Sequence, residues 1–249
     1  MDHRIRSGSL TLSAHLAVPD SARPSPGLVL CHGFPVRGRE SPASGKSFPE
    51  LADRIAVEMG WTVLTLNFRG CGQSDGDFSM SGWLDDIGAA IAHLRDQDVA
   101  GVWLAGTGTG GALALCAGSM DRSVRGVATL AAPADFDDWA KHPRRLLEHA
   151  RSVGVISTRG FPEQFDRWVA DLRSFKLGTA ASALAPRPML IMHGEEDDLV
   201  PSLDARYLAD AHGSAELRII AGAGHELRHD PRAIAVLLGW LARQQDARG

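Results

Sequence analysis

The sequence has few cysteines, no long apolar run and only a small excess of charge, and each shortage excludes a class of protein. Its three cysteines, Cys31, Cys71 and Cys116, are too few and too scattered for a disulfide framework or a zinc site. A formal net charge of −4 gives no reason to expect nucleic acid or an anionic membrane as a partner. No run reaches the length of a membrane span, and the first residues lack the apolar core of a signal peptide. We therefore expect a cytoplasmic protein.

The chain is also without an internal repeat, a low-complexity tract or a linker that would divide it. Its 249 residues correspond to one large domain, or to one domain with a modest insertion. Apolar residues make up 44% of the sequence and charged residues 22%, as in an ordinary globular protein. We predict a single domain over residues 1–249, and nothing in the sequence indicates an oligomeric state.

What the sequence does contain is an alternation of short apolar runs and longer segments with helical spacing. Strands are predicted at Ser9–Val18, Leu28–Cys31, Trp61–Phe68, Val102–Ala105, Val124–Ala131, Met189–His193 and Glu216–Ile220. Helices are predicted at Phe48–Met59, Ser81–Arg95, Ala112–Ala117, Ser202–Ala211 and Pro231–Gln244. This alternation predicts an α/β fold, with a doubly wound, mostly parallel sheet and helices on both of its faces.

Residues 133–185 break the alternation and indicate several short helices. We predict that they form a small helical cap, or lid, inserted over the carboxyl ends of the strands, where sheets of this kind carry their active sites. Singly, most aromatic rings of this segment are expected only to attach the cap to the sheet, but together they predict a largely apolar binding site. The rings belong to Phe136, Trp139, Phe161, Phe165, Trp168 and Phe175.

The alternation is tightest at residues 102–115, where a strand, a glycine turn and a helix follow one another directly. Four glycines occur within six residues, at positions 106, 108, 110 and 111. Such a turn directs backbone N–H groups, together with the positive end of the helix, towards one point above the sheet. That point can hold an anion, or a nucleophile beside an anion that forms during a reaction.

The same glycines also satisfy G-x-G-x-x-G between a strand and a helix, which is the pattern of a dinucleotide-binding turn. That pattern belongs on the first strand of its sheet, whereas at least three predicted strands precede this one. It also requires an acidic residue at the end of the next strand, where this chain has Leu130-Ala131-Ala132-Pro133. Both departures argue against a nucleotide, and we expect neither an organic cofactor nor a metal.

Four local patterns occur in an order that points to a family. They are His32-Gly33-Phe34, Gly106-Thr107-Gly108-Thr109-Gly110, the acidic stretch from His193-Gly194 to Val200-Pro201, and Gly222-Ala223-Gly224-His225. Over nearly its full length the chain resembles the α/β-hydrolases. In that family an oxyanion loop, a G-x-S-x-G nucleophile elbow, an acid loop H-G-x-x-D-x-x-V-P and a histidine loop follow one another in this order.

The resemblance implies a role for each matching position. His225 would be the general base, and Asp197 would orient it, because a carboxylate fixes the tautomer of a catalytic histidine and stabilises its charged form. Phe34 and Thr109 would each donate a backbone N–H group to an oxyanion. The partner that the resemblance implies is a small-molecule substrate or ligand.

Other residues compete for these roles or are expected to lie outside the site. Only the spacing to Val200-Pro201 selects Asp197 as the acid over Glu195, Glu196 and Asp198. His32 is expected to be a structural member of its loop. The histidines expected to be exposed to solvent are His93, His142, His149, His212 and His229.

The sequence departs from the family at Gly108, which occupies the vacant position of the nucleophile. Thr107 and Thr109 are poor substitutes, because the neighbours of an elbow nucleophile point away from the histidine. The predicted function is therefore hydrolysis of a small, largely apolar ester, thioester or other carbonyl substrate, with His225 activating a water. A hydrolase in which serine was changed to glycine to trap a substrate complex also fits. The alternatives are a non-hydrolytic general-base enzyme and a non-catalytic protein that binds a ligand or partner.

Overall fold

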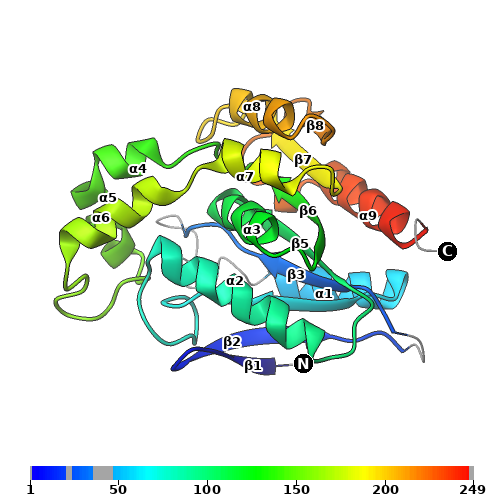
Figure 1. Cartoon of the computed structure of the whole chain (residues 1–249), viewed down its shortest axis with the longest axis horizontal. Coiled ribbons are helices and arrows are strands. Elements are labelled where there is room, and N and C mark those ends of the chain that lie inside the picture. Colours follow the sequence, from blue (N-terminus) through cyan, green and yellow to red (C-terminus); the bar gives the residue numbers. More distant parts are fainter. Residues whose placement is uncertain (1, 21–23, 36–46, 247–249) are drawn as a thin grey trace.

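The computed structural model describes residues 2–20, 24–35 and 47–246, which form one central sheet with helices on both faces (Figure 1). The strands lie in the order β1-β2-β4-β3-β5-β6-β7-β8. The pairs β1–β2 and β2–β4 are antiparallel and the other pairs are parallel. The strands are β1 (Asp2–Ser7), β2 (Leu10–Ala17), β3 (Gly27–Cys31), β4 (Thr62–Leu66), β5 (Val102–Thr107), β6 (Val124–Leu130), β7 (Met189–Gly194) and β8 (Glu216–Ile220).

The mostly parallel sheet confirms the prediction, and every predicted strand is present. The edge strand β1 was not predicted, because only one of its side chains, Ile5, is apolar and enters the core. An edge strand is held largely by its backbone hydrogen bonds to the neighbouring strand, so its sequence need not alternate strongly.

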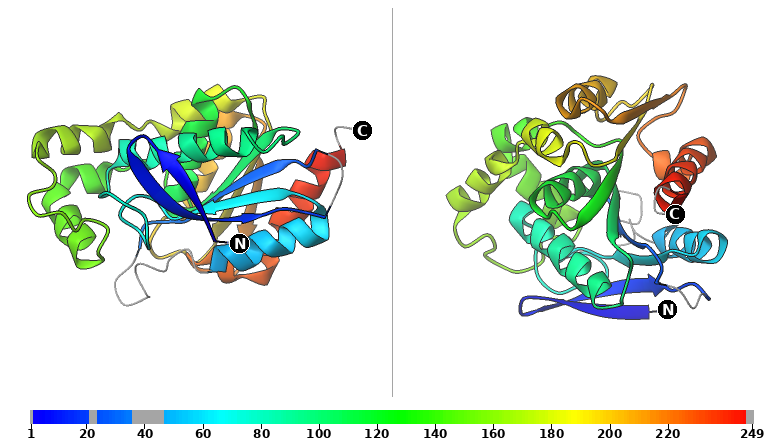
Figure 2. Two further views of the ribbon diagram at one scale, coloured as in Figure 1. Left: turned by 90° about the horizontal axis from the view of Figure 1, so that it is seen from below. Right: turned by 45° about the vertical axis from the view of Figure 1, so that its right-hand side comes forward.

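Helices cover both faces of the sheet (Figure 2). One face carries α1 (Ser47–Met59) and α9 (Pro231–Asp246), and the other carries α2 (Met80–Arg95), α3 (Gly108–Met120), α7 (Leu177–Leu184) and α8 (Ser202–His212). Alternate residues of a central strand enter the two cores, which is why β3 is apolar without interruption. None of the helices in the described ranges combines the length and the apolar character needed to cross a bilayer.

The three cysteines are buried and unpaired with one another. Burial raises the pKa of each thiol, so the reactive thiolate is disfavoured. Cys31 and Cys116 therefore act as small core residues, as their positions in apolar runs indicate.

The segment predicted as a cap has two parts. Helices α4 (Asp137–Lys141), α5 (Pro143–Ser152) and α6 (Phe165–Ser174) lie to one side of the sheet (Figure 1), whereas α7 packs against α3 and α8 over the sheet itself. The buried carboxylate of Asp77 ties the first part to the body, since it accepts backbone N–H groups from Ser157 at 2.6 Å and Thr158 at 3.0 Å. That this segment acts as a lid stays a prediction.

Replacing one helical glycine is expected to stabilise the protein. Gly88 lies on the exposed face of α2, and a Cβ built on it has no atom within 4 Å outside its own helix. Gly88→Ala should raise the free energy of unfolding by about 0.5–1 kcal/mol, because alanine loses less backbone entropy in a helix. Urea unfolding measures this change.

The matched control is the same substitution on the buried face of α3. A Cβ on Gly118 would lie 2.6 Å from Cγ2 of Val127, so Gly118→Ala should destabilise the protein by about 1–3 kcal/mol. A loss of stability in Gly88→Ala would contradict the orientation of α2.

Candidate active site

The turn from β5 into α3 requires its glycines because two loops approach each other closely. A Cβ on Gly106 would lie 2.6 Å from the carbonyl oxygen of Gly110, and a Cβ on Gly110 would overlap the carbonyl oxygen of His32. The predicted oxyanion loop at residues 32–34 is therefore packed directly against the turn. Gly108 has a φ of +50°, a backbone conformation that glycine adopts without strain.

Position 108 faces the predicted base. A Cβ built on Gly108 would lie 3.6 Å from Nε2 of His225 and 3.9 Å from Cα of Gly33. A hydroxyl one bond further out would come within hydrogen-bonding reach of the imidazole. The next residue, Thr109, lies in the first turn of α3, where a backbone N–H has no acceptor within the helix. The structure thus brings Phe34, Gly108, Thr109 and His225 to the lining of one pocket.

The predicted acid touches the predicted base. Strands β7 and β8 are adjacent and parallel, so the loops that follow them meet at one edge of the sheet. His225 donates from Nδ1 to Oδ2 of Asp197 over 2.8 Å, and the Asp197 side chain is fully buried. Oδ1 of Asp197 accepts the backbone N–H groups of Leu199 and Val200, each at 2.9 Å. Asp198, by contrast, is exposed.

These hydrogen bonds determine the charge of the acid. Burial by itself would raise the pKa of Asp197, but the hydrogen bonds from His193, His225 and the Val200 N–H outweigh it and hold the pKa well below its usual range. An ionised carboxylate only accepts hydrogen bonds, so Nδ1 of His225 carries the proton. Nε2 of His225 is then the ring nitrogen that faces position 108.

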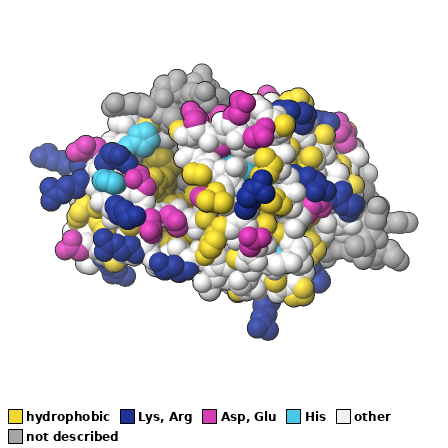
Figure 3. Space-filling view, turned by 90° about the horizontal axis from the view of Figure 1, so that it is seen from above, with side chains coloured by type: hydrophobic (Ala, Val, Ile, Leu, Met, Phe, Trp, Pro, Cys, Tyr) yellow, Lys and Arg dark blue, Asp and Glu magenta, His cyan; other side chains and the backbone are white. Residues whose placement is uncertain are grey.

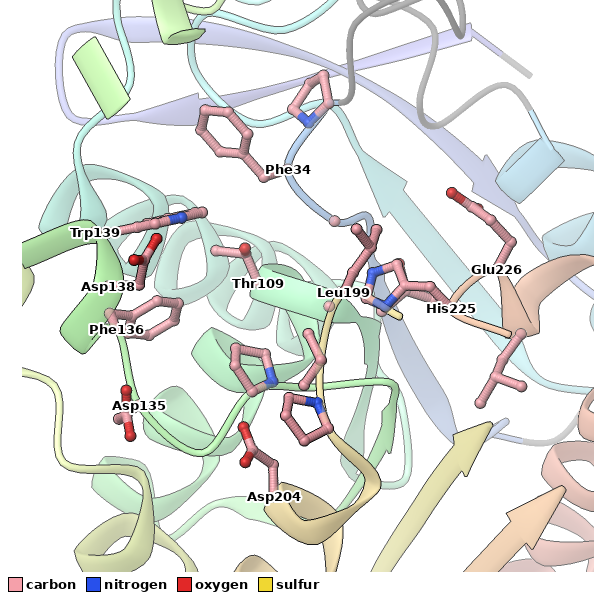
Figure 4. Close-up of a pocket in the computed structure, with 18 of the residues that line it drawn as sticks. Phe34, Thr109, Asp135, Phe136, Asp138, Trp139, Leu199, Asp204, His225 and Glu226 are labelled. Carbon is pink, nitrogen blue, oxygen red and sulfur yellow. The ribbon is translucent and has the colours of Figure 1, made fainter. Parts of the chain in front are cut away.

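A cavity of about 510 Å³ opens above this pair. Phe34, Phe136 and Trp139 lie on one side of it and His225 on the other, with the Thr109 side chain on the Trp139 side, away from His225 (Figure 4). From outside, a hollow with apolar side chains in it opens on the face shown in Figure 3. The pocket can therefore enclose a small substrate between aromatic walls and a histidine.

The aromatic side chains within 133–185 have two different roles. Phe136 and Trp139 line the cavity, and the ring of Trp139 contacts Phe34 with a centroid separation of 5.1 Å. Trp168 and Phe175 do not line this cavity and belong only to the main core, which Phe136 also enters. Trp168 donates there from its indole N–H to the carbonyl of Phe78. Only part of the aromatic set therefore faces the site.

Two histidines predicted to be exposed to solvent are not fully exposed. His149 of α5 lines the cavity beside Phe34, with ring centroids 5.8 Å apart. His212 is buried at the end of α8 and its Nε2 bonds the carbonyl of Arg187 at 3.0 Å. The prediction was wrong for His212, whereas His149 is half-buried and lines an open cavity. His149 follows the buried Leu146 by three positions, and that helical spacing was the available signal for its face.

His32 holds the shape of the predicted oxyanion loop. Its Nδ1–H donates to the carbonyl of Gly33 at 2.8 Å, and its Nε2 accepts the backbone N–H of Phe68 at 3.2 Å. Burial lowers the pKa of His32 to about 4, which keeps the ring neutral at physiological pH. This geometry fits the structural role expected for His32.

The neutral state of His32 predicts an acid sensitivity. Between its ordinary pKa near 6.5 and its folded value of about 4, the unfolded chain binds more protons than the folded one. Stability therefore rises with pH across this window, and lowering the pH from 7 to 4 should cost on the order of 3 kcal/mol through this one group. Urea unfolding between pH 4 and pH 7 measures it. In His32→Gln the slope of the unfolding free energy against pH should correspond to about one proton fewer. An unchanged slope would contradict the assignment of a neutral, buried His32.

The described residues of the site do not form a set of metal ligands. Across residues 2–20, 24–35 and 47–246, no three His, Cys, Asp or Glu side chains are grouped so that they could hold a metal ion. Strand β6 ends at Leu130 and is followed by two alanines, so the carboxylate that would hold a nucleotide ribose is not at that position.

The Alpha/beta hydrolase family matches the chain over residues 28–237, which is most of its length. The chain belongs to this family. The 2-hydroxymuconate semialdehyde hydrolase of Pseudomonas sp. (strain CF600) is 34% identical over 89 residues, or 35% of this chain and 30% of that protein. An uncharacterized 31.7 kDa protein of Escherichia coli is 28% identical over 165 residues, or 63% of this chain and 53% of that protein. The matches thus span about a third to a half of these relatives' lengths.

Solved structures share the fold of the α/β hydrolases. Est1E from Butyrivibrio proteoclasticus, solved with ferulic acid, has a TM-score of 0.71 and 18% identity, and the match covers 98% of this chain and 97% of that one. The meta-cleavage product hydrolase CumD from Pseudomonas fluorescens IP01 has a TM-score of 0.68 and 18% identity, with 97% and 98% covered. At such identities the likeness is evidence of fold alone, and it confirms the predicted α/β-hydrolase fold.

Proposed function

We propose that this α/β-hydrolase family member hydrolyses a small, largely apolar ester, thioester or related carbonyl compound without a covalent intermediate. The observation that carries the proposal is the 3.6 Å between Nε2 of His225 and the position of a Cβ on Gly108. Glycine leaves the space of a nucleophilic side chain open next to a base whose other nitrogen is bound to Asp197. A water molecule in that space would occupy the place of the attacking hydroxyl.

The proposed reaction moves one proton in two steps. Nε2 of His225 removes a proton from the water while the water oxygen forms a bond to the substrate carbonyl carbon. The carbonyl oxygen becomes an oxyanion, which the backbone N–H groups of Phe34 and Thr109 would stabilise. As the intermediate collapses, the bond to the leaving group breaks, and His225 returns its proton to the departing alkoxide or thiolate. Asp197 stays ionised throughout and supports the charged imidazole.

The expected rate limits the substrate class. In a serine hydrolase, removal of the nucleophile costs on the order of 10⁶ in kcat and leaves roughly 10³–10⁴ over water. We therefore expect substrates with a good leaving group or a strongly polarised carbonyl. The aromatic walls at Phe34, Phe136 and Trp139 favour a planar, ring-bearing or conjugated group in the pocket. Ferulic acid in Est1E and the semialdehyde named for the Pseudomonas relative are compounds of this general kind.

Gly108 itself favours one second candidate, a protein that binds such a ligand and does not turn it over. In that case the His225–Asp197 pair would contribute to ligand binding alone. A parent enzyme with serine at position 108 would leave the same geometry, and so would a non-hydrolytic enzyme that uses His225 as a base. These candidates differ in whether replacing His225 changes a reaction rate or only an affinity.

The deciding experiment replaces His225 in the protein with Gly108 retained. His225→Ala should lower the rate of hydrolysis of p-nitrophenyl and thiophenyl esters by a factor on the order of 10² or more, because the general base is lost. Intact-mass analysis of quenched reactions should show no acyl adduct, and fluorophosphonate probes should label no residue. His93→Gln is the control, since His93 lies on α2, bonds His3 of β1 and does not line the cavity.

An unaffected rate in His225→Ala would remove water activation as the function. If ligand binding then remained measurable without turnover, the binding candidate would replace it. Stoichiometric labelling of any residue by a fluorophosphonate would refute the site as a whole.

A further inference from the structure

A second histidine reaches the acid of this site from the opposite side. His193 is the penultimate residue of β7 and is fully buried. Its Nε2 lies 2.9 Å from the carbonyl oxygen of Val200 and 3.2 Å from Oδ2 of Asp197. The Oδ2 atom that receives the Nδ1–H of His225 thus also faces His193.

The contacts of His193 assign its tautomer. A backbone carbonyl only accepts hydrogen bonds, so Nε2 carries the proton and donates it to Val200, with Oδ2 of Asp197 as a second acceptor. The Nδ1 atom is buried and has no hydrogen-bond partner among the described residues. A proton on Nδ1 would be unsatisfied there, so the surroundings select the tautomer that points an N–H at the acid loop.

All hydrogen-bond acceptor positions of the Asp197 carboxylate are therefore used. Oδ1 accepts two backbone N–H groups, and Oδ2 accepts from two imidazoles, which together use the four lone-pair directions of a carboxylate. Val200 closes the arrangement, since its N–H donates to Asp197 and its carbonyl accepts from His193.

We propose that His193 is a positioning residue that shares Oδ2 of Asp197 with His225 and thereby limits how strongly the carboxylate supports a charge on the base. Two donors on one oxygen divide its negative charge between them. Without the His193 donor, the whole of Oδ2 would face His225, and the imidazolium would be favoured. A base that is protonated at neutral pH cannot accept a proton, so the shared oxygen keeps Nε2 of His225 available.

Several other charged groups lie near His225 and also influence its protonation. Glu226 and Arg228 follow it closely in the chain and pair at 3.2 Å. The remaining titratable side chains that line the pocket are His149 of α5, Asp138 of α4, Asp204 of α8 and Asp135 in the loop after β6. None of these is changed in the experiment below, so a difference between variants reports the His193 contact.

The test is an NMR titration of His225 in ¹⁵N-histidine-labelled protein. In His193→Phe, which keeps an aromatic ring and removes the donor, the pH midpoint of the His225 titration should rise by about one pH unit. The resonance of the His225 Nδ1–H should move to lower field as its hydrogen bond strengthens. His193→Gln offers an N–H at a similar reach and should return the midpoint close to its original value.

His212→Phe is the matched control, because it also removes a buried histidine that bonds a backbone carbonyl but does not touch Asp197. Its His225 midpoint should be unchanged. An unchanged or lower midpoint in a folded His193→Phe protein, or equal shifts in the Phe and Gln variants, would overturn the proposal. His193→Leu replaces the Phe variant if that does not fold. A His193 proton found on Nδ1 in the unaltered protein would overturn it without any variant.

The inference rests on the proposed role of His225 as a base, yet the titration needs no turnover. A shifted midpoint in a protein that hydrolyses nothing would refute the proposed function and leave the His193 contact established. An unshifted midpoint in an active protein would do the reverse.

Discussion

Gly108→Ser is expected to yield a protein that fluorophosphonates label stoichiometrically and that hydrolyses short p-nitrophenyl esters with a kcat raised by a factor on the order of 10³ or more. The new Cβ would lie 3.6 Å from Nε2 of His225, so the hydroxyl would be placed for proton transfer to a base already held by Asp197. Covalent catalysis would then replace direct attack by water. Active-site titration and steady-state kinetics measure the change.

Gly108→Ala is the control for this gain. It adds the same Cβ at a φ of +50°, which should cost either variant about 1–2 kcal/mol of stability, and it provides no hydroxyl. The alanine variant should remain unlabelled, and its methyl group should also displace the proposed water and reduce the basal rate. A folded Gly108→Ser protein that stays inert and unlabelled would show that position 108 and His225 are not arranged as in a hydrolase.

Asp197→Asn in the Gly108→Ser background should lower kcat by a factor on the order of 10⁴, as loss of the orienting carboxylate does in a serine protease. The amide can still accept the N–H groups of Leu199 and Val200 through Oδ1. Its NH₂ group would then face the N–H groups of His225 and His193, so donors would oppose donors. His225 would be driven to carry its proton on Nε2, where the lone pair is needed.

Asp198→Asn removes the same charge from the exposed neighbouring carboxylate and should leave the Gly108→Ser rate within a factor of about two or three. Kinetics of the single and double variants against the same ester measure both effects. If the two substitutions had equal effects, the acid would be misassigned among the carboxylates of this loop.

The free-energy cost of burying the Asp197 carboxylate is relevant to the proposed function. Asp197 is a buried charge, and burial of a carboxylate is unfavourable unless hydrogen bonds compensate for it. Four donors compensate here, from two backbone N–H groups and two histidines. Aliphatic side chains could fill the same volume without that requirement. A buried carboxylate whose hydrogen bonds are this completely satisfied is consistent with an Asp197–His225 pair that still supports a charge on His225.

Much of the fold was predictable because the central strands are buried on both faces. Strands β3, β5 and β7 are buried on both faces, so each appears in the sequence as a mostly apolar run between its flanking turns. β1 was missed because a single side chain, Ile5, anchors it to the core. The packing of α7 on α3 was missed for another reason. Its apolar residues indicate burial but not against which surface.

Of the candidate site, the loops could be placed from spacing, but their contacts could not. Glycines at 106 and 110 mark a turn that only small residues can form, so the turn could be found in the sequence. The presence of His149 in the pocket depends on how α5 is oriented against Phe34, 115 positions earlier. The contact of His193 with Asp197 depends on how the loop after β7 folds back.

The sequence by itself determined the alternation of strands and helices, and it has glycine at position 108, where the resemblance to the family predicts the nucleophile. Both are local properties, since apolar periodicity and residue identity do not depend on distant packing. Only the tertiary structure decided which carboxylate binds His225 and that His193 shares it. Hydrogen bonds form over about 3 Å, and the positions of these groups depend on the packing of separate strands and loops. Such distances are fixed by the assembled sheet.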